Sequence, residues 1–237
     1  MWILTIFLLL IGIGGLYIGS KEWFTIDRLN KTNVLNGALA ILIFFTMLMV
    51  AFVLGYFPQS IAAPFMMTGY SIIGGFFIGY AYRLFSMRGD AGHSLYQQRS
   101  FWIDHAPNLL AAALIIYGIF RTSILTEQPV TGIRLTSGIS LMSFGFYCWT
   151  LNVVPEFRSR GIIFLDRFIH WREVVAWDWL RESVLKIEYI LETENKEESL
   201  SQFLTSIPEE ERKEVETILK SKMDEYIDFR RKRLIND

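Results

Sequence analysis

The first two-thirds of the sequence contains very little charge. Residues 1–155 hold 8 of the 23 Lys and Arg residues and 5 of the 24 Asp and Glu residues, and residues 156–237 hold the other 15 and 19. A soluble domain carries about 25% charged residues, spread over its whole surface. This asymmetry excludes a single soluble globule. It predicts a membrane domain over residues 1–155, followed by a soluble domain over residues 156–237.

Cysteine is nearly absent, and the common catalytic motifs are missing. The single cysteine, Cys148, excludes an internal disulfide and a multi-cysteine metal site. No G-x-x-x-x-G-K-[ST], G-x-S-x-G, H-E-x-x-H or paired C-x-x-C motif occurs. The net charge of −1 gives no general attraction for nucleic acid. We therefore predict no enzyme activity, no catalytic residues, no metal site and no nucleic-acid partner, while any cofactor is unknown.

Long uncharged runs predict membrane-spanning helices. The run from Thr32 to Tyr82 would be about 77 Å long as one helix, more than twice the thickness of the hydrocarbon core. It must fold back, and Gly55 and Pro58 mark the turn. The first span is expected to be retained, because it lacks a basic start and a signal-cleavage site. The predicted fold is a bundle of five transmembrane helices, at residues 2–19, 34–54, 61–82, 107–125 and 135–154.

The Lys and Arg residues between the spans predict the orientation. In a five-span arrangement, nine of them fall on one side: Lys21, Arg28, Lys31, Arg83, Arg88, Arg99, Arg158, Arg160 and Arg167. The other side has only Arg121 and Arg134. Basic loops stay in the cytoplasm. We therefore expect a multi-pass protein of the bacterial cell (inner) membrane, with its amino terminus outside and its carboxyl terminus in the cytoplasm.

Two pairs of glycines are spaced for close helix packing. Gly15 and Gly19 in the first predicted span, and Gly75 and Gly79 in the third, are four residues apart and share one helix face. Small residues at this spacing let two backbones approach closely. We favour packing within one chain over a dimer seam, because the spacing is common in membrane helices.

The carboxyl-terminal region predicts a small α+β domain. Residues 162–165, 168–171, 174–179, 185–191 and 199–205 have the apolar or alternating patterns of an antiparallel sheet. Ser206, Pro208 and Glu209 then signal the start of a helix. Apolar residues fall on one face of that helix: Val215, Ile218, Leu219, Met223, Tyr226 and Ile227.

Several short sequences in this region resemble the PH-like domains appended to bacterial membrane proteins, a family of unknown function. They are Arg160-Gly161-Ile162, the run from Phe168 to Val174, Trp177, and Val184-Leu185-Lys186-Ile187. The resemblance implies a sheet closed by a carboxyl-terminal helix, with a binding or scaffolding role and no identified ligand. The region has room for about five strands, fewer than a full PH barrel. A truncated sheet and a sheet completed in a dimer are both open alternatives.

Basic and aromatic residues are the candidate contacts with a partner or with lipid. Trp171 and Trp177 form a candidate binding surface, although packing in a core or at the membrane interface is favoured. The run Arg230-Arg231-Lys232-Arg233 either caps the last helix or binds anionic lipid. Arg88 and Arg99 belong to a polar loop that also contains Asp90, His93, Asp104 and His105. That loop matches no metal signature, and a solvated or subunit-contact role is favoured over acid–base catalysis.

These features predict a non-enzymatic accessory, assembly or scaffold subunit of a membrane complex that acts through its cytoplasmic PH-like domain. The expected partners are membrane lipids and other membrane-protein subunits or further copies of the chain. A small transporter or channel, as a single chain or a homo-oligomer, is the second hypothesis. Acidic residues and Lys are missing from the middle of the spans, which disfavours an ion-coupled carrier. A membrane enzyme that uses the loop histidines is the third hypothesis.

Overall fold

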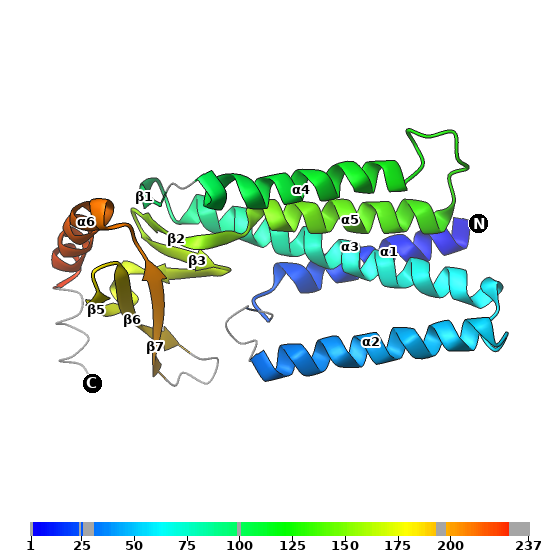
Figure 1. Ribbon diagram of the computed structural model, residues 1–237, viewed down its shortest axis with the longest axis horizontal. Helices are drawn as coiled ribbons and strands as arrows, with labels where there is room; N and C mark the ends of the chain where they lie inside the picture. Colours follow the sequence, from blue (N-terminus) through cyan, green and yellow to red (C-terminus); the bar gives the residue numbers. More distant parts are fainter. Residues whose placement is uncertain (1, 24, 26–30, 99–100, 193–197, 228–237) are drawn as a thin grey trace. The chain divides into compact units, whose positions relative to one another are not determined.

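The computed structural model divides the chain into two compact units (Figure 1). It describes residues 2–23, 25, 31–98, 101–192 and 198–227. Unit 1 consists of Met1–Ser86 and Asp104–Leu151, and unit 2 of Met87–Ile103 and Asn152–Asp237. Unit 2 is therefore discontinuous in sequence, unlike the predicted domain over residues 156–237. The difference arises because a segment between two helices contributes to the sheet of unit 2.

The amino-terminal region is helical, as the sequence predicts. Its helices are α1 (Trp2–Ser20), α2 (Lys31–Val53), α3 (Gln59–Asp90), α4 (Phe101–Arg121) and α5 (Gly132–Thr150). Each overlaps one of the predicted spans, but the ends differ. α3 continues past Tyr82 through the basic residues to Asp90, and α5 ends at Thr150 because Leu151 takes an extended conformation.

Two helices in the described part of the chain are long and apolar enough to cross a membrane. They are Leu35–Val53 and Gln59–Asp90, and two shorter apolar stretches lie at Ile6–Ser20 and His105–Arg121. This finding rests on length and composition, a test that a buried helix of a soluble protein also passes. The structure thus shows two helices of spanning length, and the five crossings stay a prediction.

Glycines bring α1 and α3 together. A Cβ atom added at Gly19 would lie 2.1 Å from the carbonyl oxygen of Phe76, and one at Gly79 would lie 2.1 Å from a carbonyl oxygen of α1. Gly15 and Gly75 meet the facing backbone at 2.6 and 2.0 Å in the same way. The four glycines that the sequence singles out therefore pack two helices of one chain, backbone against backbone.

α4 and α5 lie side by side and pack in a similar way (Figure 1). A Cβ at Gly118 would lie 2.8 Å from the carbonyl oxygen of Gly138, and one at Gly138 would lie 2.6 Å from that of Gly118. A Cβ at Gly74 of α3 would lie 3.3 Å from the Cα of Ser140 in α5. α3 thus packs against both α1 and α5 and occupies the centre of unit 1.

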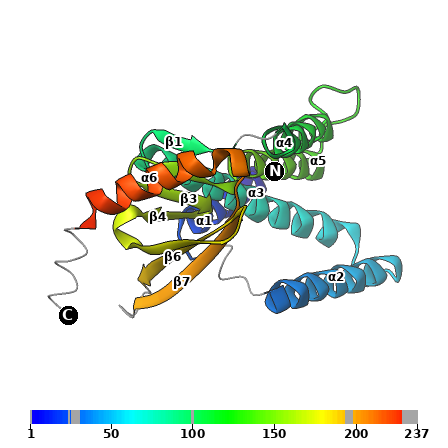
Figure 2. The same ribbon diagram turned by 60° about the vertical axis from the view of Figure 1, so that its left-hand side comes forward.

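Unit 2 contains two antiparallel sheets and a final helix, which confirms the predicted sheet and helix (Figure 2). One sheet has the order β1-β2-β3-β4, with β1 at Ser94–Gln97, β2 at Asn152–Arg158, β3 at Gly161–Leu165 and β4 at Arg167–His170. The other has the order β5-β6-β7, with β5 at Val174–Arg181, β6 at Val184–Glu192 and β7 at Glu198–Ser206. Single turns of 3₁₀ helix lie at Trp171–Glu173 and Glu209–Glu211, and the last precedes α6 (Arg212–Glu225).

The sequence patterns do not predict β1 and β2. β1 belongs to the segment expected as a polar loop, and β2 begins inside the predicted fifth span. The pairing of β2 with β3 is irregular between Asn152 and Glu156, where Pro155 has no N–H to donate. With these strands the described residues form seven strands rather than about five.

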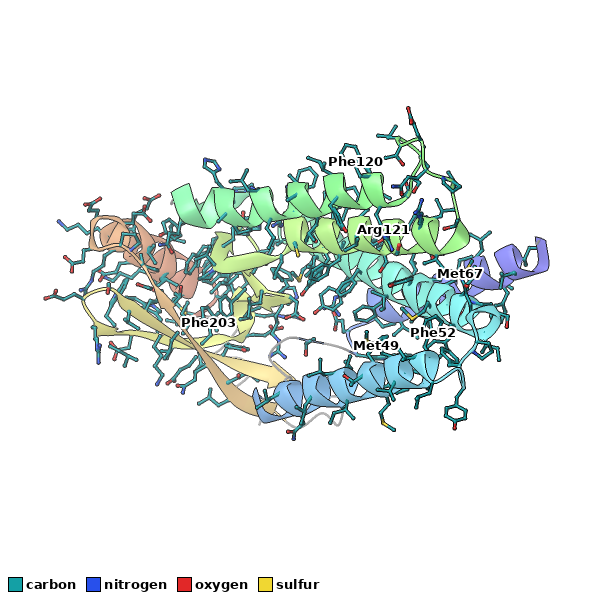
Figure 3. The ribbon with its side chains drawn as sticks, turned by 45° about the vertical axis from the view of Figure 1, so that its right-hand side comes forward. Met49, Phe52, Met67, Phe120, Arg121 and Phe203 are labelled. Carbon is teal, nitrogen blue, oxygen red and sulfur yellow. The ribbon has the colours of Figure 1, made fainter. Side chains whose placement is uncertain are left out.

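The core of unit 2 lies between the two sheets and α6. Phe203 of β7 (Figure 3) belongs to this core. Its ring stacks on that of Phe164 of β3, with the centroids 4.9 Å apart. Val215 and Leu219 of α6 are fully buried in the same core, whereas Ile227, expected on that helix face, is exposed. Burial of these apolar side chains supplies the main stabilising free energy of the unit.

Candidate functional site

Arg158 of β2 holds the carboxyl end of α3. Its Nη1 donates hydrogen bonds to the carbonyl oxygens of Arg88, at 2.9 Å, and Gly92, at 2.6 Å. Its Nη2 lies 2.9 Å from Oε1 of Glu156 on the same strand. Carbonyl groups at the end of a helix have no partners within the helix and carry the negative end of its dipole. A guanidinium group is therefore well suited to cap them.

This ion pair is largely withdrawn from solvent. Glu156 is 3% exposed, and Nε of Arg158 is buried with no hydrogen-bond partner in the described part of the chain. Two buried charges must recover their lost hydration through mutual attraction and hydrogen bonds. The ion pair and the hydrogen bonds to two carbonyl oxygens offset part of that loss, and they hold the end of α3 on the sheet.

The turn after α3 contacts the turn between β2 and β3 and is hydrogen-bonded to it. Gly92 has a φ of +82°, and a Cβ atom there would lie 2.2 Å from Oγ of Ser159. The backbone N–H of Ser159 donates to the carbonyl oxygen of His93 at 2.9 Å. The backbone N–H of Arg160 donates to the carbonyl oxygen of Ala91 at 3.2 Å. Glycine is required at position 92 both for its backbone conformation and for this close approach.

The residues of the predicted polar loop are distributed over two helices and a turn. Arg88 and Asp90 end α3, and His93 lies in the turn that precedes β1. Asp104 and His105 belong to α4, and Arg99 lies outside the described residues. Among the described residues, no group of three His, Cys, Asp or Glu side chains is arranged to hold a metal ion.

The two candidate tryptophans pack against the core of unit 2. Trp171 is 1% exposed, and its Nε1 donates a 2.8 Å hydrogen bond to the carbonyl oxygen of Arg158. Its ring stacks on that of Phe157 at 6.2 Å. Trp177 is partly buried against the same cluster. Trp171 therefore has the packing role that the sequence favours, and its indole does not form part of an outer surface.

Tyr96 is a site residue that the sequence analysis does not find. It is buried on β1, and its hydroxyl donates a short hydrogen bond to Oε2 of Glu211, just before α6. Burial raises the pKa of the Tyr96 hydroxyl, and the hydrogen bond and charge of Glu211 raise it further. Tyr96 thus links the first strand to the last helix of unit 2. A lone tyrosine in a four-residue strand gives no sequence signal for this role.

Basic and aromatic side chains meet where α1 ends beside α3 in unit 1. Nη1 of Arg83 donates a 2.7 Å hydrogen bond to the carbonyl oxygen of Lys21, and its guanidinium lies 4.2 Å from the ring centroid of Tyr80. Nζ of Lys21 lies 4.9 Å from the ring centroid of Tyr17. Cations beside aromatic rings at helix ends are typical of a membrane–water interface.

Two further candidates are Arg121 and the run from Arg230 to Arg233. Arg121, expected to reach toward lipid headgroups, is exposed at the last residue of α4 (Figure 3). The run from Arg230 to Arg233 lies outside the described residues. The structure therefore gives no contact for that run.

Comparison with known proteins gives one match. Residues 154–224 match a protein-family model described as a domain of unknown function (DUF5673). No curated protein and no solved structure matched the chain. The matched segment extends from β2 into α6 and leaves out β1. It shows that this part of unit 2 is similar to a recognised domain, and it assigns no reaction or ligand.

Proposed function

We propose that the protein is a five-span integral membrane protein whose cytoplasmic PH-like module makes it an accessory, assembly or scaffold subunit of a membrane complex. The observation that carries the proposal is the insertion of α4 and α5 between β1 and β2, so that the chain passes between the units three times. A domain attached by one flexible linker reorients freely. Three covalent connections suit a module that presents one surface to a fixed partner.

The strand order supports a PH-like module. A four-stranded and a three-stranded antiparallel sheet follow one another along the chain, and α6 then packs its apolar face into their shared core. The resemblance implies an antiparallel sheet followed by a carboxyl-terminal helix. The sequence patterns indicate about five strands, fewer than in a full PH barrel. β1 and β2, which those patterns do not include, bring the number in the described residues to seven.

The surface of the helices supports a membrane environment. No described residue of the Leu35–Val53 stretch is buried, and large apolar side chains such as Met47 and Met49 are exposed there. A helix whose exposed surface is apolar along its whole length is unfavourable in water. The same helix is stable in lipid, because its backbone N–H and C=O groups bond to one another within the helix. The Lys21 and Arg83 cluster adds the interface residues that such a helix bundle requires.

A small transporter or channel is the second candidate, and the buried serines of α5 are its support. The hydroxyls of Ser137 and Ser143, however, donate to the carbonyl oxygens of Arg134 and Ile139 in their own helix, at 3.1 and 2.7 Å. Because these hydroxyls already have hydrogen-bond partners within α5, their burial does not require a path for solute. The contacts between facing glycines also favour close packing over a passage at those helix pairs.

Recovery of partners from membranes tests the proposal. The full chain would be purified in mild detergent and analysed by native mass spectrometry, beside Trp171→Ala and Trp149→Ala. Trp171 is buried in unit 2, whereas Trp149 is exposed on α5. We expect the wild type and Trp149→Ala to retain other membrane-protein subunits and Trp171→Ala to lose them while staying in the membrane fraction. Recovery of the chain alone, or retention of the same subunits by Trp171→Ala, would contradict the proposal. Solute flux into liposomes that contain the purified chain would support the transporter instead.

A further inference from the structure

β7 forms an outer edge of the second sheet (Figure 2). Within the described residues it pairs along one side only, with β6, in continuous register from Glu198 to Ser206. Edge strands in soluble domains are usually protected by charge, proline or a bulge, because their free N–H and C=O groups attract further strands. β7 has no charged residue and no proline from Ser199 to Ser206. It is long and regular, and its single charged residue, Glu198, stands at its first position.

At the centre of β7, the outward side chains are symmetric about Gln202, whereas the strand ends, Glu198 and Ser206, differ. Leu200, Gln202 and Leu204 face outward, and the two leucines are 66% and 53% exposed. Phe203 and Thr205 face inward and are buried. On the outer face, leucine therefore stands two residues before Gln202 and two residues after it. A strand with this symmetry is complementary to itself when two copies run antiparallel.

We propose that β7 is the site of self-association, where it pairs antiparallel with β7 of a second copy about a two-fold axis at Gln202. In this register Leu200 of each copy lies opposite Leu204 of the other, and the two Gln202 amides lie side by side. The three-stranded sheet then continues into a sheet of six strands, and the edge N–H and C=O groups gain partners. This inference does not depend on the proposed function, because it concerns copies of this chain and not other subunits.

The charges near this edge favour a second copy over a charged partner. The adjacent outward residues of β6, Lys186 and Glu188, form an ion pair with Nζ and Oε1 2.5 Å apart. Lys186 pairs in register with Leu204, and Glu188 with Gln202. From Ser199 to Ser206 the edge thus offers no net charge to a peptide, and the single charged residue of β7, Glu198, would lie opposite the uncharged Ser206 of the second copy. Two copies bring no like charges opposite one another on their β7 strands.

Charge substitutions at the two-fold position test this proposal. In the full chain in detergent, Gln202→Lys would place two ammonium groups opposite each other, and Gln202→Glu two carboxylates. We expect each variant alone to raise the dimer dissociation constant by about tenfold or more, because like charges directly opposite are destabilising. Mixing the two variants should restore the dimer, which a merely misfolded protein cannot do. Unchanged dimers in either variant alone, or no recovery on mixing, would overturn the proposal.

A matched pair of leucines controls for added surface charge. Leu204 of β7 and Leu180 of β5 are both 53% exposed, on the opposite edge strands of one sheet. Light scattering should show weaker dimerisation for Leu204→Lys and the wild-type mass for Leu180→Lys. Equal effects, or a monomeric wild-type chain, would also overturn the proposal. These measurements count copies of this chain, so their failure is separate from failure to recover other subunits.

Discussion

The glycines of α3 differ in what faces them. A Cβ at Gly79 would lie 2.1 Å from a backbone carbonyl oxygen of α1, whereas Gly69 has no atom within 4 Å of that position. A backbone atom cannot move aside as the end of a flexible side chain can. Gly79 is therefore required for the approach of α1 to α3, and Gly69 is replaceable.

Alanine should lower the stability of the helical unit at position 79 but not at position 69. We expect Gly79→Ala to destabilise the helical unit by about 1–3 kcal/mol, the usual cost of overpacking. Gly69→Ala should be neutral or stabilising by up to about 1 kcal/mol, because alanine favours the helix. Thermal unfolding of the full chain in detergent measures both. Equal midpoints for the two variants would show that α1 and α3 do not pack through Gly79.

The Tyr96–Glu211 hydrogen bond makes the stability of unit 2 depend on alkaline pH. The folded-state pKa of Tyr96 is raised above its ordinary value of about 10. Stability contributed by the neutral hydroxyl is therefore fully present below about pH 10 and is lost as the pH rises through the folded-state pKa. Replacing Tyr96 with phenylalanine removes both the contribution and its pH dependence.

We expect Tyr96→Phe to lose about 1.5–3 kcal/mol at neutral pH, the usual range for a hydrogen bond to a charged group. Above about pH 10 its free energy of unfolding should fall less steeply than that of the wild type. Denaturant unfolding of unit 2 within the full chain, followed by tryptophan fluorescence from pH 8 to 11, measures this difference. Parallel pH profiles would contradict the assigned hydrogen bond.

Residue roles were predictable where they follow from local spacing. The four-residue spacing of Gly15 and Gly19 indicates a close helix contact, and the apolar surroundings of Trp171 favour packing. The roles of Arg158 and Tyr96 depend on residues far along the chain: Arg158 caps α3, and Tyr96 contacts Glu211. A short sequence motif cannot predict contacts between residues so far apart in the sequence.

At the scale of elements, β1 is the strand of unit 2 that lies farthest in sequence from the rest of its sheet. It pairs antiparallel with β2, with Ser94 opposite Arg158 and Gln97 opposite Glu156. Without β1, the edge of β2 would lose its partner strand, and the ring of Phe157 would lose its contact with that of Tyr96, at 5.6 Å between centroids. β1 is therefore needed for the stability of a domain that lies almost entirely at the other end of the sequence.

Replacing residues 94–97 with Gly-Ser-Gly-Ser tests this role. We expect faster hydrogen exchange across β2 and β3, residues 152–165, because β2 loses its partner strand. The matched control replaces residues 126–129, in the connection between α4 and α5, with the same four residues. That change should leave exchange in unit 2 as in the wild type. Unchanged protection of β2 in the first variant would exclude a structural role for β1.

The strands from β3 to β7 were predictable because each pairs with a neighbour across a short connection, and alternation or short apolar runs mark them. β1 and β2 pair across the whole α4–α5 insertion. β1 has only four residues, and β2 continues an uncharged run that resembles a span. Pairing over such a distance leaves no periodic signal in the sequence.

At the scale of the whole molecule, the change in composition and the boundary between units do not coincide. Charge rises after Pro155, but unit 2 already includes Met87–Ile103 and Asn152–Pro155. Composition predicts which segments face lipid or water, whereas the units are defined by contacts. The sequence therefore predicts an apolar region and a charged region. It does not show that one strand of the unit 2 sheet, β1, comes from within the apolar region.

The central claim is that five helices cross the membrane and that unit 2 is in the cytoplasm. Single cysteines in a Cys148→Ser background test it directly, at Gln59 and Gln128 on the proposed outer side and at Ser94 in β1; all three positions are exposed. A membrane-impermeant maleimide applied to intact cells should label positions 59 and 128, and label position 94 only after the inner membrane is opened. Labelling of positions 94 and 128 from the same side would contradict the account, because α4 would then not cross the membrane.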